Sequence, residues 1–198
     1  LDYPRFAKHE RLVGATRENL IHPHYVVWQD YISRFYETPK TKKYALFLPC
    51  SFKKPYSRSR THKEILRRLV SLPQYNEIHQ LMISNPGVIP REFEAKYPFA
   101  NYDWPEWQEN KKIKKEYTDV TKERLQKYLS RHKYKRVFAY FKPDSESFIA
   151  LSRACRELGV NLIPCFDKKT YDGLTDKDGV LYNRKMLDVL IKTLRDKM

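Results

Sequence analysis

The chain has 198 residues, of which 41% are hydrophobic, so it can bury one sizeable core and is too apolar to be disordered. Its 39 lysines and arginines outnumber 24 acidic residues, and the formal charge of +15 favours a polyanionic partner such as nucleic acid over a merely solvated basic surface. We find no apolar run of membrane-spanning length and no signal-peptide pattern, so we expect a cytoplasmic protein that binds no membrane.

The first predicted elements alternate between helix and strand. Apolar residues at helical spacing predict an amphipathic helix over His22–Glu37, and the apolar run Tyr44–Pro49 predicts a buried strand. A second helix is predicted over Thr61–Leu72 and a second strand over Glu77–Ser84. The following residues 85–90, which contain two prolines and a glycine, predict a turn-rich connection.

The second half of the chain continues the alternation after an irregular segment. Residues Arg91–Trp107 predict an aromatic loop, and a strongly charged helical region follows to about His132. We further predict strands over Arg136–Phe141 and Asn161–Cys165, a helix over Asp144–Leu158 with Asp144 as its N-cap and Gly159 as its stop, and a last helix from about Lys177 to Lys197.

This alternation predicts an α/β fold, a three-layer sandwich with a mostly parallel sheet. We expect residues 1–198 to form a single domain with an N-terminal helical extension. Ligands of such sheets bind outside the carboxyl ends of the strands. Cys50 and Ser84 each follow or end a predicted strand, so this edge of the sheet is the candidate site.

The stretch "PCSFKKPYSRSRTH" surrounds Cys50 with cations at that edge. Lys53, Lys54 and the start of the next helix would lower the pKa of the thiol and make it a nucleophile. His62 would act as general base or acid, and Arg58 would hold a phosphate or carboxylate. A structural strand-end cysteine is the alternative, and a zinc site from Cys50, His62 and Cys165 lacks a recognised ligand spacing.

The same stretch resembles the signature of the archaeosine synthase family. That signature is Pro-Cys, three residues, Lys-Pro-Tyr, two residues, Ser, two residues, His, and the downstream "ISNPGVIPREFEAKYPFANYD" is similar to the family's second block. The resemblance covers about His22 to Phe141. After Asp103, "WPEWQENKK" replaces the family's usual Val-Thr-Gly-containing segment, and we expect this chain to be a truncated member without the transglycosylase-like and PUA regions. The matching signature residues are Pro49, Cys50, Lys54, Pro55, Tyr56, Ser59 and His62.

The resemblance implies a fold similar to uracil-DNA glycosylases and a transferase that acts on 7-cyano-7-deazaguanine in archaeal tRNA, a step of archaeosine biosynthesis. Free lysine is implied as the co-substrate that adds its side-chain amine to the nitrile. A radical SAM partner enzyme would then split the adduct, and a PUA-containing subunit could supply tRNA affinity. We expect no cofactor in this chain. Attack on the nitrile by Cys50 follows from thiol chemistry, and direct attack by the amine stays open.

We predict three groups of site residues on this basis, and no metal ligand. The catalytic group is Cys50, His62 and Asp103. The substrate-binding group is Pro49, Ser51, Lys54, Tyr56, Ser59, Ser84, Arg91, Glu94 and Tyr102. The RNA-binding group is Lys53, Arg58, Arg60, Lys111, Lys112, Lys114 and Lys115.

Two further functions compete with the transferase. A non-catalytic tRNA-binding subunit of a multi-subunit archaeosine-forming complex is favoured by the altered "WPEW" segment and the missing PUA domain. A base-excision glycosylase follows from fold resemblance alone and is the weakest hypothesis.

Overall fold

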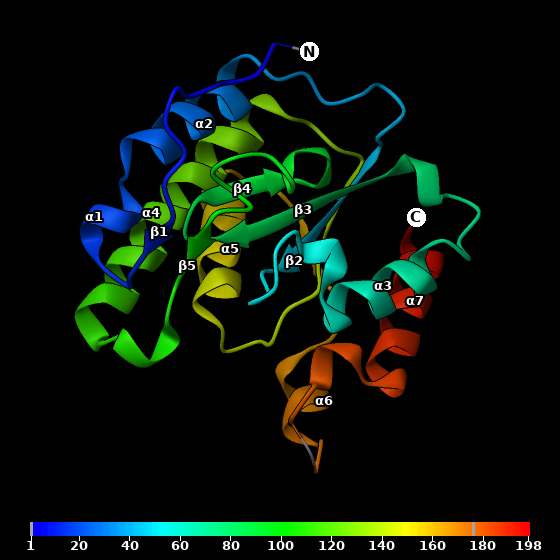
Figure 1. Ribbon diagram of the computed structural model, residues 1–198. Coiled ribbons are helices and arrows are strands. Elements are labelled where there is room, and N and C mark those ends of the chain that lie inside the picture. The colour runs from blue at the N-terminus through cyan, green and yellow to red at the C-terminus, as the bar shows by residue number, and fades with distance from the viewer. Residues whose placement is uncertain (1, 176) are drawn as a thin grey trace.

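The computed structural model describes residues 2–175 and 177–198, and within them a five-stranded sheet runs through the centre of the molecule (Figure 1). The strand order is β4-β3-β2-β6-β7, in which β4 is antiparallel to β3 and the other neighbours are parallel. The predicted α/β class with a mostly parallel sheet is therefore confirmed. The strands are β2 (Tyr44–Pro49), β3 (Ile78–Ser84), β4 (Gly87–Pro90), β6 (Arg136–Ala139) and β7 (Leu162–Pro164).

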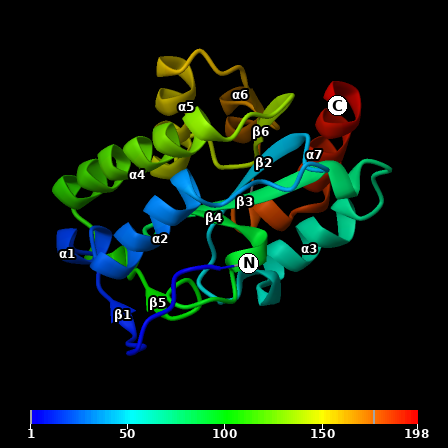
Figure 2. The same cartoon turned by 90° about the horizontal axis from the view of Figure 1, so that it is seen from above.

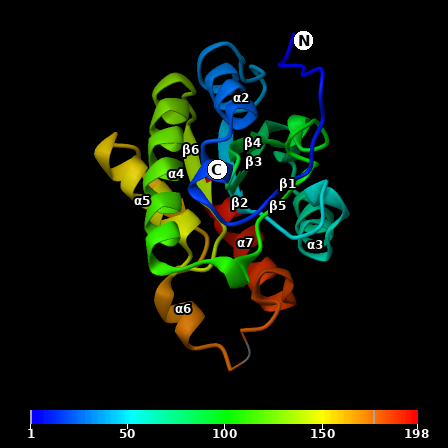
Figure 3. The same ribbon diagram turned by 60° about the vertical axis from the view of Figure 1, so that its left-hand side comes forward.

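Helices cover both faces of the sheet, which gives three layers. Helices α2, α4 and α5 pack on one face and α3 and α7 on the other, as Figures 2 and 3 show from two directions. Because β2 and β3 lie between these layers, both strands are buried almost throughout, as expected for parallel strands covered on both faces. The helices are α1 (Arg17–Leu20), α2 (Pro23–Arg34), α3 (Arg60–Leu69), α4 (Lys111–Arg131), α5 (Glu146–Glu157), α6 (Lys168–Asp172) and α7 (Arg184–Lys197).

The prediction of a turn-rich connection over residues 85–90 is wrong for most of that segment. The chain turns at Asn85 and Pro86 and returns along β3 as the edge strand β4. The side chain of Gln29 in α2 accepts a hydrogen bond from the Val88 amide and donates one to the Val88 carbonyl, each 3.0 Å long. A strand of four residues that ends in proline has little sequence signal, and it is held by this contact with a distant helix.

The segment Arg91–Trp107, predicted as an irregular loop, contains short ordered elements. Its strand β5 (Tyr102–Asp103) pairs in parallel with β1 (Leu12–Val13) near the N-terminus. It also contains the 3-10 turn η3 (Arg91–Phe93), and the 3-10 turn η4 (Glu106–Gln108) begins at its end. The predicted N-terminal helical extension is helical only from Arg17 onward among the described residues, because the residues before it include β1 and otherwise run without helix.

The observed helix ends agree only in part with the ends predicted from the sequence. Gly159 has a φ of +65° and follows α5, as predicted for a helix stop. The N-cap of α5 is Ser145 rather than Asp144, because the Ser145 hydroxyl accepts the Phe148 amide at 3.3 Å. The last helix, α7, begins at Arg184 rather than near Lys177.

Candidate functional site

The candidate site lies at the carboxyl ends of β2 and β3. Cys50 follows β2 directly and is exposed, whereas Ser84 ends β3 and is buried. The Tyr102 hydroxyl in β5 donates to Ser84 Oγ at 2.6 Å and is in turn hydrogen-bonded to the hydroxyl of Tyr56 in the 3-10 turn η1 (Tyr56–Arg58). Ser84 also hydrogen-bonds the Cys50 thiol. The structure therefore joins four predicted site residues from four segments of the chain.

The prediction that the surrounding cations lower the pKa of the Cys50 thiol is wrong in sign. Packing of protein atoms around the sulfur removes water from it and raises the thiol pKa, although part of the residue reaches solvent. The hydrogen bond from Ser84 and the charge of Lys54 act in the opposite direction, and they are the smaller effects. Cys50 is therefore a protonated thiol in the resting site, and its activation requires a base.

Lys54 is a candidate for that base, because it interacts electrostatically with Cys50. Its ammonium nitrogen lies 4.1 Å from the centroid of the Tyr102 ring and donates to the Phe52 carbonyl at 3.2 Å. Partial burial lowers the pKa of Lys54, while the charges of Cys50 and Asp103 favour its protonated form. The lowered pKa makes the neutral amine of Lys54 more available as a base, whereas the raised thiol pKa makes proton transfer from sulfur to nitrogen costlier than between an ordinary thiol and amine.

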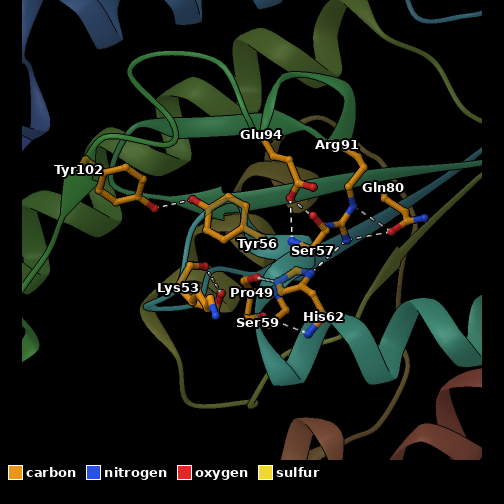
Figure 4. A network of polar contacts seen from close by, with 11 residues as sticks. Pro49, Lys53, Tyr56, Ser57, Ser59, His62, Gln80, Arg91, Glu94 and Tyr102 are labelled. Atoms are coloured by element: carbon orange, nitrogen blue, oxygen red, sulfur yellow. Dashed lines mark hydrogen bonds and ion pairs between the residues drawn. The ribbon is translucent and has the colours of Figure 1, made fainter. Parts of the chain in front are cut away.

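A buried polar network fixes the loop that presents Cys50 (Figure 4). His62 Nε2 donates to the Pro49 carbonyl at 2.9 Å, and the guanidinium of Arg91 donates to His62 Nδ1 at 3.0 Å. Arg91 also pairs with Glu94 at 3.0 Å, and Glu94 accepts the Ser57 amide at 3.1 Å. The network thereby ties the last residue of β2, the η1 turn and the first turn of α3 to the segment after β4.

His62 has no free ring nitrogen in this arrangement. It is fully buried, and desolvation together with the charge of Arg91 lowers its pKa to about 3. The imidazole is therefore neutral at physiological pH, and the geometry supports a positioning role in place of the predicted proton transfer. Arg91 is engaged by Gln80, Glu94 and His62, so its guanidinium likewise positions the loop, and its predicted substrate-binding role stays a prediction.

Ser59 has a structural role of the same kind. It is the N-cap of α3, where its hydroxyl accepts the His62 amide at 3.2 Å. Ser51 Oγ donates to the Lys53 carbonyl at 3.0 Å, which shapes the loop locally. The loop stretch from Cys50 to Lys54 lies outside the His62–Arg91–Glu94 network, and Ser51 and Lys54 there are only partly exposed.

A cavity of about 330 Å³ opens beside Lys54 and Asp103. The predicted residues Lys54, Tyr102 and Asp103 line it, and Arg11, which was not among the predicted site residues, lines it too. Arg11 directly precedes β1, and β1 reaches the site only through its pairing with β5. No local sequence signal reveals a pairing between two-residue strands that lie about ninety positions apart. The remaining lining residues are Phe52, Ala100 and Asn101.

The predicted RNA-binding cations divide into paired and unpaired side chains. Lys114 lies 3.3 Å from Glu146, Lys115 lies 2.8 Å from Asp119, and the Arg60 guanidinium lies 4.5 Å from the centre of the Tyr182 ring. In the described part of the chain no ion pair engages the other four, all of which are exposed. These four are Lys53, Arg58, Lys111 and Lys112.

Within residues 2–175 and 177–198, one group of side chains is compact enough to hold a metal ion, namely Glu10, His22 and His24. His22 Nδ1 accepts the His24 amide and caps α2, so the proton of a neutral His22 ring sits on Nε2, which faces Glu10 at 3.6 Å. That proton occupies the position that a metal would need. The hydrogen bonds therefore favour a His–Glu contact over a metal site. The site considered from Cys50, His62 and Cys165 is not assembled in the described chain.

The fold is an α/β domain whose candidate site lies at the carboxyl edge of a mostly parallel sheet, the edge at which ligands of such folds bind. Residues 26–172 match a family model described as a domain of unknown function (DUF5591). Over 138 residues, 68% of the chain, the sequence is 36% identical to the archaeosine synthase subunit alpha of Thermoplasma acidophilum and 30% identical to the archaeosine synthase of Haloferax volcanii. The chain belongs to the archaeosine synthase family.

The chain spans about a quarter of the length of these curated relatives, 25% and 22% respectively. Among solved structures, it is similar to the crystal structure of AF0587, a protein of unknown function, with a TM-score of 0.59 and 19% identity. That similarity covers 86% of this chain and 50% of the other, and it supports the fold alone. It does not bear out the predicted similarity to uracil-DNA glycosylases, which stays a prediction.

The helices of the described chain are too short or too polar to cross a bilayer. None of them combines the length and the apolar character that a membrane span requires.

Proposed function

We propose that this chain is a tRNA-modifying transferase domain of archaeosine biosynthesis. In the proposed reaction, the side-chain amine of lysine is joined to the nitrile carbon of 7-cyano-7-deazaguanine in archaeal tRNA. The observation that carries the proposal is the exposed Cys50 at the carboxyl edge of the sheet, electrostatically coupled to Lys54 beside a small cavity. Membership of the archaeosine synthase family supports the substrate class.

The first step is attack by sulfur on the nitrile. Lys54, as the neutral amine, accepts the thiol proton, and the Cys50 thiolate forms a bond to the nitrile carbon as one carbon–nitrogen π bond breaks. The nitrogen then takes the proton from the Lys54 ammonium, which leaves a neutral thioimide. Lys54 ends this step as a free base again, so the step needs no oxidant, metal or second acid.

In the second step, the former nitrile carbon exchanges its bond to the Cys50 sulfur for a bond to the ε-nitrogen of lysine. The ε-amine of lysine adds to the thioimide carbon, the carbon–sulfur bond breaks, and the departing thiolate recovers a proton from the attacking nitrogen by way of Lys54. The product is an amidine that links the base to lysine, and Cys50 returns to the thiol. A radical SAM partner enzyme would then split this adduct, and a PUA-containing subunit would strengthen tRNA binding.

The hydroxyl groups around the sulfur support this chemistry. Burial raises the pKa of Tyr56 and Tyr102 well above that of an ordinary phenol, so both remain protonated and donate hydrogen bonds. We assign to Ser84 and these two tyrosines the orientation of the sulfur. Asp103 interacts with Lys54 across the cavity and favours its ammonium form, which is the form that returns a proton to the nitrile nitrogen.

The second candidate function is a non-catalytic tRNA-binding subunit. Its supporting observation is the protonated state of the Cys50 thiol, combined with exposed cations on the loop after β2 and at the start of α4. This candidate predicts tRNA binding without any covalent species on Cys50.

Intact-protein mass spectrometry separates the two functions. The chain is incubated with tRNA that contains 7-cyano-7-deazaguanine and labelled lysine, and separately with the nucleoside of the cyano base. We expect label in the tRNA, and a protein adduct with the mass of the nucleoside that is absent from Cys50→Ser and is released by added amine. Label transfer without an adduct would favour direct attack by lysine. Binding of tRNA without label transfer would favour the non-catalytic subunit.

A further inference from the structure

The cavity beside Lys54 carries one charged group, Arg11, that the thiol chemistry leaves unused, and a second, Asp103, that this chemistry uses only through Lys54. Arg11 and Asp103 line it together with Lys54. The charges are close enough to affect one another, because Arg11 lowers the pKa of Lys54 and Asp103 raises it. Within the described residues, neither Arg11 nor Asp103 makes an ion pair. A cation and an anion therefore face the same small cavity without neutralising each other in an ion pair.

The pairing of β1 with β5 places both side chains there. Leu12 lies opposite Tyr102 and Val13 opposite Asp103 in this parallel pair. Leu12 and Tyr102 are buried, and successive side chains of a strand point to opposite faces, so Arg11 and Asp103 lie toward the solvent side. Arg11 is exposed and Asp103 is half-buried, as this alternation requires.

We propose that this cavity is the binding subsite for a free α-amino acid, with Arg11 on the α-carboxylate and Asp103 on the α-ammonium group. The inference rests on the proposed function, since the amino acid in question is the lysine that attacks at Cys50. The planar fork of an arginine matches a carboxylate with two parallel hydrogen bonds. A volume of about 330 Å³ lies at the small end of ligand pockets, which suits a single amino acid.

The charge arrangement also distinguishes an amino acid from a phosphate of the tRNA backbone. A phosphate at Arg11 would place its negative charge beside the Asp103 carboxylate, and like charges at close range oppose binding. A zwitterion instead offers a partner of the correct sign to each group. Asp103 is thus the residue that makes the cavity selective.

Bound in this way, lysine directs its side chain toward the sulfur. Lys54 and Tyr102 line the cavity and also interact electrostatically with Cys50, so they connect the two parts of the site. The four methylene groups of the ligand would lie along Tyr102 and Phe52 and bring the ε-nitrogen to the thioimide carbon. Lys54, as a neutral amine, accepts one proton from the arriving ε-ammonium, which becomes the nucleophilic amine.

The test uses two lysine analogues that each lack one α-group. 1,5-Diaminopentane lacks the carboxylate, and 6-aminohexanoate lacks the α-amine. Binding to the full chain is measured by calorimetry without tRNA, and KM is measured for transfer to tRNA. We expect wild type to prefer lysine to 1,5-diaminopentane by roughly 10- to 100-fold, since a hydrogen-bonded charge pair contributes on that order. Arg11→Gln should lose this preference, and Asp103→Asn should lose the preference for lysine over 6-aminohexanoate.

The matched control is Arg156→Gln, which removes an exposed arginine on α5 and should leave both preferences unchanged. If Arg11→Gln weakened binding of all three amines equally, or left the preference for lysine intact, the subsite would be refuted while the transferase could stand. If lysine bound with the expected preferences but no label reached tRNA, the transferase would be refuted and the subsite would stand. A loss of tRNA affinity in Arg11→Gln, with lysine binding unchanged, would refute the subsite and assign Arg11 to a contact with a tRNA phosphate.

Discussion

The two halves of the signature stretch differ in what surrounds their polar groups. His62 and Glu94 are buried, Arg91 between them is half-buried, and their charges and hydrogen bonds are satisfied within the protein. Cys50 lies on the solvent side of the same loop as an exposed residue, and Lys54 lines the cavity there. The signature and its contacts therefore contain a scaffold, namely His62, Arg91 and Glu94, and a reactive edge, namely Cys50 and Lys54. A match to the motif does not by itself show to which of the two groups a residue belongs.

The largest expected effect comes from the reactive edge. Cys50→Ala should abolish lysine transfer and adduct formation while leaving the urea midpoint of unfolding nearly unchanged, because Cys50 is an exposed loop residue outside the regular elements. Cys155→Ala is the matched control, since Cys155 is buried in α5 and its pKa is raised to about 12 by desolvation. That variant should lose stability on the order of 1 kcal/mol and keep its activity. Near-normal transfer by Cys50→Ala would remove the assigned nucleophile.

The scaffold should respond in the opposite manner. Arg91→Met leaves the buried carboxylate of Glu94 without its cation, and breaking such a pair costs about 3–5 kcal/mol in the free energy of unfolding. Urea denaturation followed by circular dichroism measures this loss. The control is Lys127→Met, which breaks an exposed pair with Glu123 and should have no measurable effect. A stable Arg91→Met protein with lost tRNA binding would instead support the predicted substrate-binding role of Arg91.

The scaffold also predicts a pH dependence that runs through His62. The pKa of this imidazole is about 3 in the folded protein and 6.5 as its ordinary value, so protons favour the unfolded chain. Its contribution to stability is complete above about pH 6.5 and is lost as the pH falls toward 3, at about 1.4 kcal/mol per pH unit. We expect the unfolding free energy of His62→Asn to fall less steeply than that of wild type between pH 6 and pH 4. Parallel profiles would contradict a buried, neutral His62.

The same contrast explains what the sequence could predict. The alternation of apolar runs with helical patterns predicted the α/β class and the strand that ends directly before Cys50. The roles of His62 and Arg91 depend on burial, which a polar residue type does not reveal. The sign of the Cys50 pKa shift depends on how many protein atoms surround the sulfur, and the sequence shows only the neighbouring cations. Arg11 was missed because only the pairing of β1 with β5 brings it to the cavity.

The smallest expected effect separates paired from unpaired cations at the start of α4. Lys111 and Lys112 are exposed without an ion pair in the described chain, whereas Lys114 and Lys115 are engaged by acidic neighbours. Replacing the first pair by glutamine should lower tRNA affinity and reduce the slope of log affinity against log salt by about 2, because each of these lysines neutralises one phosphate. Replacing the second pair should change the slope less, because a cation already neutralised by a carboxylate releases fewer counterions. Filter binding at several salt concentrations measures both slopes, and Cys50→Ala serves as a control that should match wild type. Equal slopes for the two double variants would show that tRNA displaces the acidic partners, and two unchanged slopes would exclude this face of α4 from the RNA interface.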